Sequence, residues 1–267
     1  MIFLFDNHVH TTYSADSAAK PGDIIAGAKA EGLSGICFTD HWDVGYDSVN
    51  RENIVPYEYS RCDLRGLRRE GGFSVYCGIE IAPMDHVLDR VREEMADAEF
   101  DFVMLSAHYV EDVPQMRYDG FFQGKAKKDA YDRYLSTLIS IMGKYYDFDA
   151  LGHFDYITRY SPYDDPLMRY GEQAEKLDEL FSVLIRLGKA LEINTGKHNE
   201  RISGIPLDRR VLERYRELGG ELVMLGSDAH RAADVGFKFG DYRPLLIECG
   251  FPYAVHYVSR KPVFTKL

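Results

Sequence analysis

Histidine and carboxylate residues occur in this sequence in pairs whose spacing suits a metal ion. His8 and His10 form a His-x-His pair, and Asp228 and His230 form an Asp-x-His pair. In an extended segment residues i and i+2 point to the same side, so both members of a pair can reach one centre. Imidazole and carboxylate ligands together suit Zn, Mn or Fe. The pairs therefore predict metal binding, although one such histidine alone is often only hydrogen-bonded.

Residues of this chemistry stand at the ends of apolar runs that are typical of strands buried on both faces. The runs cover residues 3–5, 35–39, 73–80, 102–106, 150–152, 190–194 and 222–226. The residues that end or follow them are His8 and His10, His41, Glu80, His108, His153, and Asp228 with His230. Six such sites on successive strand ends are difficult to explain by chance.

Helical patterns separate the apolar runs, at residues 21–31, 126–145, 172–187 and 207–218. The first has Pro21 in its opening turn and Gly32 directly after it, as helices often do. Seven strand–helix units predict an α/β fold, a distorted (β/α)7 TIM-like barrel with residues 1–267 in a single domain. An open doubly wound sheet is the alternative. In a barrel the carboxyl ends of the strands converge on one mouth, so the candidate ligands would meet there.

Composition limits the partners of the chain. Of the 267 residues, 45% are hydrophobic and 28% charged, which is ordinary for a globular protein, and the net charge is −11. This charge opposes binding to nucleic acid, which requires a basic surface. No apolar run reaches the ~20 residues that span a bilayer. The first residues lack the features of a signal peptide and the four cysteines are widely scattered, so we expect a cytoplasmic protein with reduced thiols and no membrane partner.

The order of these motifs resembles that of the polymerase and histidinol phosphatase (PHP) superfamily over essentially the whole chain. The matching segments are Asp6-Asn7-His8-Val9-His10-Thr11, Thr39-Asp40-His41, Gly78-Ile79-Glu80, Ser106-Ala107-His108, Gly152-His153 and Gly226-Ser227-Asp228-Ala229-His230. The resemblance implies a distorted barrel with three divalent metal ions, which could be Zn, Mn or Fe. It also implies that a metal-bound hydroxide is the nucleophile and that no separate protein nucleophile exists.

Carried over to this chain, the resemblance assigns ligands to each ion. The first ion would be held by His8, His10, Glu80 and Asp228, the second by Glu80, His108 and His153, and the third by Asp16, His41 and His230. Asp16 stands where some members have histidine, and it could instead be a turn acid before Pro21. Asp40 could accept a hydrogen bond from an imidazole or could be a turn residue, and it is not expected to be a ligand.

The segment from His153 to Tyr160 resembles the histidinol-phosphatase branch, as does Tyr131-Asp132-Arg133-Tyr134-Leu135. Arg159 is the expected phosphate-binding residue, because a guanidinium suits a phosphate. After Glu192-Ile193-Asn194-Thr195 the sequence departs from the pattern of that branch, and Lys197 is the expected second phosphate contact. The predicted function is therefore hydrolysis of histidinol phosphate, a small phosphorylated substrate, in histidine biosynthesis.

Other functions stay open at this point. Within the superfamily the substrate could be a nucleotide, another small phosphoester or phosphotyrosine. An editing module would be expected to carry polymerase domains or a basic groove. A metal-dependent amidohydrolase also uses His-x-His, but it normally has a carboxylated lysine or fewer carboxylates, and Glu80 fits the PHP pattern better.

Outside the motifs, His86 is expected to face solvent and His256 to be packed or at a sheet edge, whereas His198 is undecided. The identity of the metals and the oligomeric state do not follow from the sequence.

Overall fold

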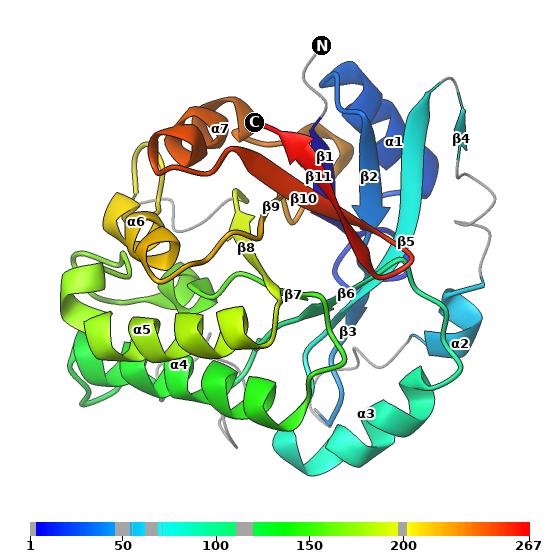
Figure 1. The fold of residues 1–267 in the computed structure, drawn as a ribbon. Helices are drawn as coiled ribbons and strands as arrows, with labels where there is room; N and C mark the ends of the chain where they lie inside the picture. The colour runs from blue at the N-terminus through cyan, green and yellow to red at the C-terminus, as the bar shows by residue number, and fades with distance from the viewer. Residues whose placement is uncertain are drawn as a thin grey trace.

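Seven parallel strands form the centre of the fold (Figure 1). The computed structural model describes residues 4–45, 54, 56–61, 69–70, 72–110, 120–196 and 202–267. In sheet order the strands are β1 (Phe5–Val9), β2 (Gly35–Phe38), β5 (Phe73–Ile81), β6 (Phe102–Leu105), β7 (Ala150–Leu151), β8 (Ala190–Asn194) and β9 (Val223–Gly226). Two further strands pair with β5, namely β3 (His41–Trp42) in parallel and β4 (Arg69–Glu70) antiparallel.

The first and last strands of this order meet and nearly close the sheet. Val9 forms a parallel bridge with Ala229, and the His10 amide donates to the Ala229 carbonyl oxygen at 2.9 Å. The Asp6 carboxylate accepts hydrogen bonds from the amide and the hydroxyl of Ser227, at 2.9 and 2.5 Å. The fold is thus the predicted distorted α/β barrel, and the open doubly wound alternative is wrong.

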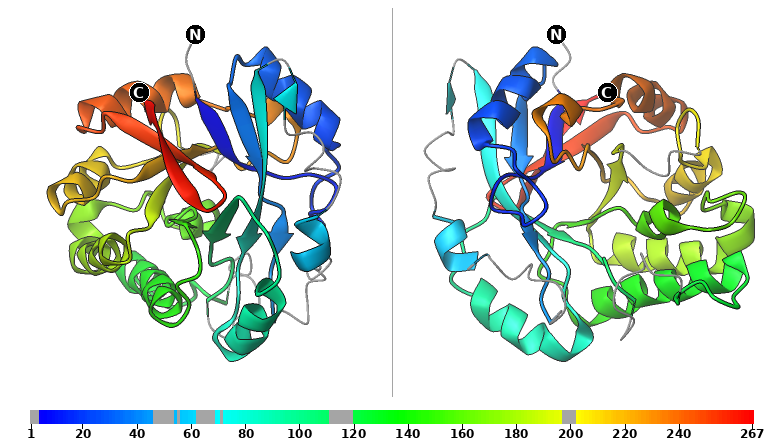
Figure 2. Two further views of the ribbon diagram at one scale, coloured as in Figure 1. Left: turned by 45° about the vertical axis from the view of Figure 1, so that its right-hand side comes forward. Right: turned by 180° about the vertical axis from the view of Figure 1, so that it is seen from behind.

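Helices surround the barrel on the outside (Figure 2). They are α1 (Pro21–Ala30), α2 (Pro56–Tyr59), α3 (Leu88–Met95), α4 (Lys127–Lys144), α5 (Tyr170–Arg186), α6 (Arg209–Glu217) and α7 (Phe239–Glu248), with 3-10 helices η2 (Asp85–Val87), η3 (Tyr156–Tyr160) and η4 (Ala232–Asp234). The four predicted helices correspond to α1, α4, α5 and α6. Within the described residues, no helix combines the length and apolar character that crossing a membrane requires.

A C-terminal hairpin covers the amino-terminal end of the barrel. It consists of β10 (Tyr253–Val258) and β11 (Lys261–Lys266), drawn in red in Figure 2. The Tyr257 hydroxyl donates to the carbonyl oxygen of Asp149 at 3.1 Å, and the Arg260 amide donates to that of Asp101 at 2.8 Å. Asp101 and Asp149 directly precede β6 and β7. The hairpin therefore forms a floor at the amino-terminal end of the barrel.

Apolar side chains fill the barrel above this floor. The inner cluster comprises Cys37, Phe102, Met104, Ala150, Ala190, Met224, Val255 and Tyr257. Cys37 and Cys77 are buried free thiols, as predicted. Cys249 is also a buried free thiol, and Cys62 lies outside the described residues.

The predicted position of the first strand was wrong. The prediction placed it at residues 3–5 with His8 after its end, whereas β1 begins at Phe5 and contains His8. The apolar run stops at Asp6, but the polar side chains of residues 6–8 have partners inside the sheet. Asn7, for example, donates to the carbonyl oxygen of Leu225 at 3.0 Å. Buried polar groups that are hydrogen-bonded in this way are compatible with a central strand.

Candidate metal centre

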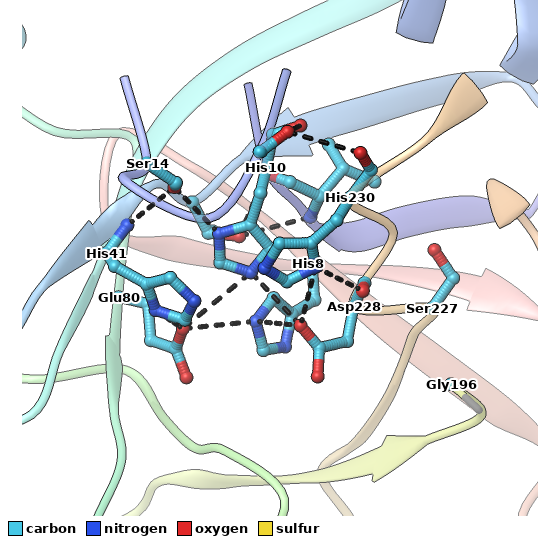
Figure 3. Close-up of polar contacts among 12 residues, drawn as sticks. His8, His10, Ser14, His41, Glu80, Gly196, Ser227, Asp228 and His230 are labelled. Atoms are coloured by element: carbon cyan, nitrogen blue, oxygen red, sulfur yellow. Dashed lines mark hydrogen bonds and ion pairs between the residues drawn. The ribbon is translucent and has the colours of Figure 1, made fainter. Parts of the chain in front are cut away.

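The nine predicted ligands gather at the carboxyl-terminal mouth of the barrel. Figure 3 labels six of them, namely His8, His10, His41, Glu80, Asp228 and His230. The nine ligands come from the end of β1, the start of β3, the end of β5, the segments after β6, β7 and β9, and the loop before α1. One placement differs from the prediction, because His8 lies within β1 rather than after it. His41 follows β2, as predicted, and also opens the short strand β3. The expected convergence of strand ends is otherwise what the structure has.

Glu80 lies at the middle of the cluster. Its Oε1 is 2.8 Å from Nε2 of His153 and 3.2 Å from Nε2 of His108. Its Oε2 is 2.7 Å from Nδ1 of His41 and 3.3 Å from Nε2 of His8. One carboxylate therefore faces imidazoles from both sides of the mouth, as a ligand shared by two ions would.

Several polar atoms of this cluster are buried without a hydrogen bond among the described residues. They are Nε2 of His8, Nε2 of His10, Nδ1 of His41 and Oε2 of Glu80. The side chains of His8, His10 and Glu80 have no exposed surface. Buried polar atoms are rarely left without a partner, because their desolvation is then uncompensated. Histidine nitrogens and carboxylate oxygens that converge in this way fit a divalent cation.

Histidine and carboxylate residues of the cluster form groups of three whose ligand atoms are close enough to bind one ion. Within each triplet the atoms lie within 4.8 Å of one another. The triplets are His8, His10 and Glu80; His8, His153 and Asp228; Glu80, His108 and His153; His10, His41 and His230; and His41, Asp43 and His108. Because the triplets share members, the site can hold more than one ion.

The surroundings lower the pKa of Glu80 and of His10, whereas they raise the pKa of His8 and of His108. Burial would raise the pKa of Glu80, but His8, His41 and His108 outweigh burial and hold it well below its usual range. Burial together with the nearby His41 and His230 lowers the pKa of His10 well below its usual range. Ionised carboxylates and a neutral imidazole are the protonation states that bind metal.

The third predicted ligand set forms the solvent side of the cluster. Asp16 has one carboxylate oxygen 3.6 Å from Nε2 of His41 and the other 3.3 Å from Nε2 of His230. The side chains of Asp16 and His230 are 33% and 27% exposed, in contrast to the buried Glu80. The structure thus brings these three residues together at the opening of the site.

Hydrogen bonds on the far side of the imidazoles hold them in place. Ser14 Oγ donates to Asp40 at 2.7 Å, so it accepts from Nδ1 of His10 at 3.0 Å. This arrangement places the proton of His10 on Nδ1 and leaves Nε2 with a lone pair toward the cluster. Nδ1 of His108 lies 2.9 Å from the buried Asp43, and Nδ1 of His8 lies 2.6 Å from the buried Glu192.

Asp40 is a turn residue rather than a direct hydrogen-bond acceptor for an imidazole, which were the two roles considered from the sequence. Its carboxylate accepts from the amide and hydroxyl of Thr11 at 2.6 and 2.8 Å, from the amide of Ser14 at 3.1 Å and from the hydroxyl of Tyr59 at 2.6 Å. It therefore organises the turn that carries Ser14, and it affects His10 only through Ser14.

Arg159 lies beside the cluster and lines two adjoining cavities. Its guanidinium donates to Asp228 at 2.5 Å and lies 4.9 Å from the ring centre of Tyr156. The larger cavity, of about 280 Å³, is lined by Asp16, His41, His108, Tyr156, Arg159, Tyr160, Asp228 and His230. The smaller, of about 210 Å³, is lined by Arg159, Gly196, Ser227, Asp228, His230, Arg231, Asp234 and Phe237. Lys197, the other expected phosphate contact, lies outside the described residues, as does His198.

Known proteins resemble this chain in sequence and in structure. The sequence profile of the PHP domain matches residues 6–196. A histidinol-phosphatase of Lactococcus lactis is 29% identical over 252 residues, which cover 92% of this chain and 91% of the relative. A probable histidinol-phosphatase of Clostridium acetobutylicum is 27% identical and covers 98% of this chain and 96% of its own.

A solved structure extends the likeness to the fold. The crystal structure of histidinol phosphate phosphatase from Lactococcus lactis, complexed with zinc, L-histidinol and phosphate, superimposes with a TM-score of 0.88 and 29% identity. The match covers 98% of this chain and all of that one. Since the profile spans more than half of the chain and includes most of the clustered residues, this protein belongs to the PHP domain family.

Proposed function

We propose that this protein is a metal-dependent phosphomonoesterase that hydrolyses histidinol phosphate to histidinol and phosphate, a step of histidine biosynthesis. The observation that carries the proposal is the convergence of histidine nitrogens on the buried carboxylate of Glu80 at the barrel mouth. The match in fold to a histidinol phosphate phosphatase that holds zinc, L-histidinol and phosphate supports this substrate. One PHP-type domain over residues 1–267 and a cytoplasmic location belong to the same proposal.

The proposed centre holds three divalent ions. The ligand sets are His8, His10, Glu80 and Asp228 for the first, Glu80, His108 and His153 for the second, and Asp16, His41 and His230 for the third. The zinc in the related structure supports zinc as one of these ions, and the ligand types would equally accept manganese or iron. The buried atoms of His8, His10, His41 and Glu80 that have no hydrogen bond among the described residues support the first and third sets.

The chemistry divides between ions and side chains. Bound divalent ions would lower the pKa of water toward 7 and offset the negative charge of the phosphoryl group. Arg159 contributes the planar guanidinium that suits phosphate oxygens. It lines both cavities beside the ligands, so a phosphate bound in either cavity would be close to its guanidinium. The ring of Tyr156 lies beside the guanidinium.

No protein nucleophile is required by this arrangement. The residues around Glu80 are imidazoles and carboxylates, some of which also line the larger cavity, and these groups would serve as metal ligands. Ser14 is buried and makes hydrogen bonds to His10 and Asp40, so its hydroxyl is not placed to attack a substrate.

A panel of phosphomonoesters tests the proposal. Purified protein would be stripped of metal, supplied with zinc, manganese or iron separately, and assayed for release of inorganic phosphate. We expect histidinol phosphate to be hydrolysed much faster than nucleoside monophosphates or phosphotyrosine. Equal rates on all three substrates would be consistent with a phosphoesterase but would exclude histidinol phosphate as its specific substrate. Preference for a nucleotide would favour a PHP phosphoesterase that acts on nucleotides.

A further inference from the structure

Glu192 on β8 is a buried carboxylate that holds two parts of the candidate centre at once. Its Oε1 lies 2.6 Å from Nδ1 of His8, and its Oε2 accepts a hydrogen bond from the backbone amide of His153 at 2.6 Å. The side chains of Glu192 and His8 have no exposed surface. Both oxygens of one carboxylate are thus used by residues that come from β1 and from the end of β7.

A glycine opens the path between Glu192 and His8. In the sheet β9 lies between β8 and β1, and Gly226 is the last residue of β9. A Cβ atom at position 226 would stand 2.1 Å from Oε1 of Glu192 and 2.6 Å from Cβ of His8. Any side chain larger than a hydrogen atom would therefore block the contact. Glycine at this position allows Glu192 to reach across a strand.

Glu192 differs in charge from Ser14, which also joins two ligand-bearing segments. Ser14 Oγ is a neutral hydroxyl that lies 3.0 Å from Nδ1 of His10 and accepts from the His41 amide at 3.1 Å, whereas Asp43 holds His108 through one of its carboxylate oxygens. Glu192 is a carboxylate whose two oxygens contact His8 and the amide of His153.

We propose that Glu192 is a positioning residue of the metal centre, which holds the proton of His8 on Nδ1 and directs its Nε2 toward Glu80 and Asp228. Nε2 of His8 lies 3.3 Å from Glu80 and 3.5 Å from Asp228, without a hydrogen bond of its own. A carboxylate behind a ligating histidine orients the ring and strengthens it as a ligand. The inference rests on the metal centre of the proposed function, but not on the identity of the substrate.

Glu192→Gln tests the role with little change of volume. Glutamine has one acceptor oxygen, so it can serve His8 or the His153 amide but not both, and its amino group would face the other donor. Zinc affinity of the metal-free protein, measured by competition with a chromophoric chelator, should fall about 10–100-fold. Gly226→Ala should weaken zinc binding in the same direction, because it displaces the unaltered carboxylate.

Asp101→Asn is the matched control. Asp101 is equally a buried carboxylate that accepts backbone amides, from Cys77 at 3.1 Å and Ser259 at 3.2 Å, but it lies at the floor of the barrel. It should lower the unfolding temperature and leave zinc affinity unchanged. Equal loss of zinc affinity in both variants would overturn the proposal in favour of a general effect on stability.

A second measurement requires no variant. In the zinc-loaded protein with ¹⁵N-labelled histidine, long-range ¹H–¹⁵N spectra should place the proton of His8 on Nδ1. A proton on Nε2, or unaltered zinc affinity of Glu192→Gln, would overturn the positioning role. If the unaltered protein binds no zinc, manganese or iron, the metal centre and this inference are both wrong. If zinc binding depends on Glu192 but histidinol phosphate is not hydrolysed, only the proposed substrate is wrong.

Discussion

Glu80 is the residue on which the proposed centre most depends, because His8, His41, His108 and His153 all approach its two oxygens. Glu80→Gln replaces an anionic donor that two ions would share with a neutral amide of nearly the same shape. We expect metal content and phosphatase turnover to fall together. Elemental analysis of the purified variant, beside an assay of the same sample, measures both.

Circular dichroism of Glu80→Gln would establish that the variant is folded, and Asp101→Asn would show the effect of removing a buried negative charge elsewhere. Full metal occupancy together with unaltered turnover would remove Glu80 from the centre.

Arg159 tests the substrate side of the site. Arg159→Ala should retain the metals but lose charge-assisted hydrogen bonds to phosphate, which are typically worth ~1.5–3 kcal/mol. Since each 1.36 kcal/mol is about tenfold in rate, kcat/KM should fall at least ~10-fold. Arg159→Lys should restore part of it, because an ammonium group lacks the planar fork.

The contact of Arg159 with Asp228 makes metal analysis of the variant essential. If Arg159→Ala loses metal as well as activity, Arg159 acts through Asp228 rather than on phosphate. Arg92→Ala on α3, which removes an exposed arginine far from the cavities, should leave kcat/KM unchanged.

Much of the candidate site could be predicted from the sequence at the scale of residues, because ligand types at strand ends form a local pattern. The residues that support the ligands could not. Glu192 and His8 are 184 positions apart, and Asp43 and His108 are 65 apart. The chain has 43 aspartate and glutamate residues, so only three-dimensional contacts distinguish Asp43 and Glu192 from the other acidic residues, and the same holds for Ser14 among the serines.

At the scale of elements, the long apolar runs and the amphipathic helices were predicted because burial on both faces leaves a continuous hydrophobic pattern. The prediction placed β1 too early, because its polar residues interrupt the apolar pattern and their partners across the sheet are not visible in the sequence. α7 was not predicted, and it contains Pro244, a residue that usually interrupts helices. The function of β10 and β11 as a floor follows from contacts with segments more than 100 positions away.

The floor hairpin provides a prediction about pH. His256 on β10 is buried and stacks on Phe5 with ring centres 3.7 Å apart. Burial lowers its pKa from 6.5 to about 4. Below pH 6.5 the unfolded chain therefore takes up a proton at His256 that the folded protein does not, and the contribution of His256 to the free energy of unfolding falls as the pH decreases toward 4.

His256→Phe keeps a flat ring but removes this titration, so the loss of stability between pH 6.5 and 4 should be smaller than in the unaltered protein. Urea unfolding across this range, with metal-free protein in both cases, measures the difference. His86→Gln, which removes an exposed histidine from η2, should keep the slope of the unaltered protein. An equal slope in His256→Phe would show that His256 is protonated in the folded state.

At the scale of the whole molecule, the barrel keeps the floor and the site at opposite ends. The hairpin holds the amino ends of β6 and β7, whereas the candidate ligands join β1, β3, β5 and the segments after β6, β7 and β9 at the other end. The protein as a whole carries a net charge of −11, and bound cations would reduce the repulsion among the carboxylates of the mouth. Metal binding and the stability of the closed barrel should therefore be linked.

Removal of metal tests this link. A ligand that binds only the folded state at a free concentration of 1,000 times Kd stabilises it by about 4 kcal/mol. For a chain of roughly this length, 1 kcal/mol shifts the unfolding temperature by ~2–4 °C. A chelator should thus lower the unfolding temperature on the order of 10 °C, and added zinc should restore it, whereas chelator already saturated with zinc should have no effect. In Glu80→Gln the unfolding temperatures with chelator and with added zinc should differ less than in the unaltered protein, because the variant is expected to bind fewer ions. If elemental analysis shows that the chelator has removed the metal while the unfolding temperature stays the same, the ions do not hold the strand ends together, and closure of the barrel depends on the contacts of β1 with β9 alone.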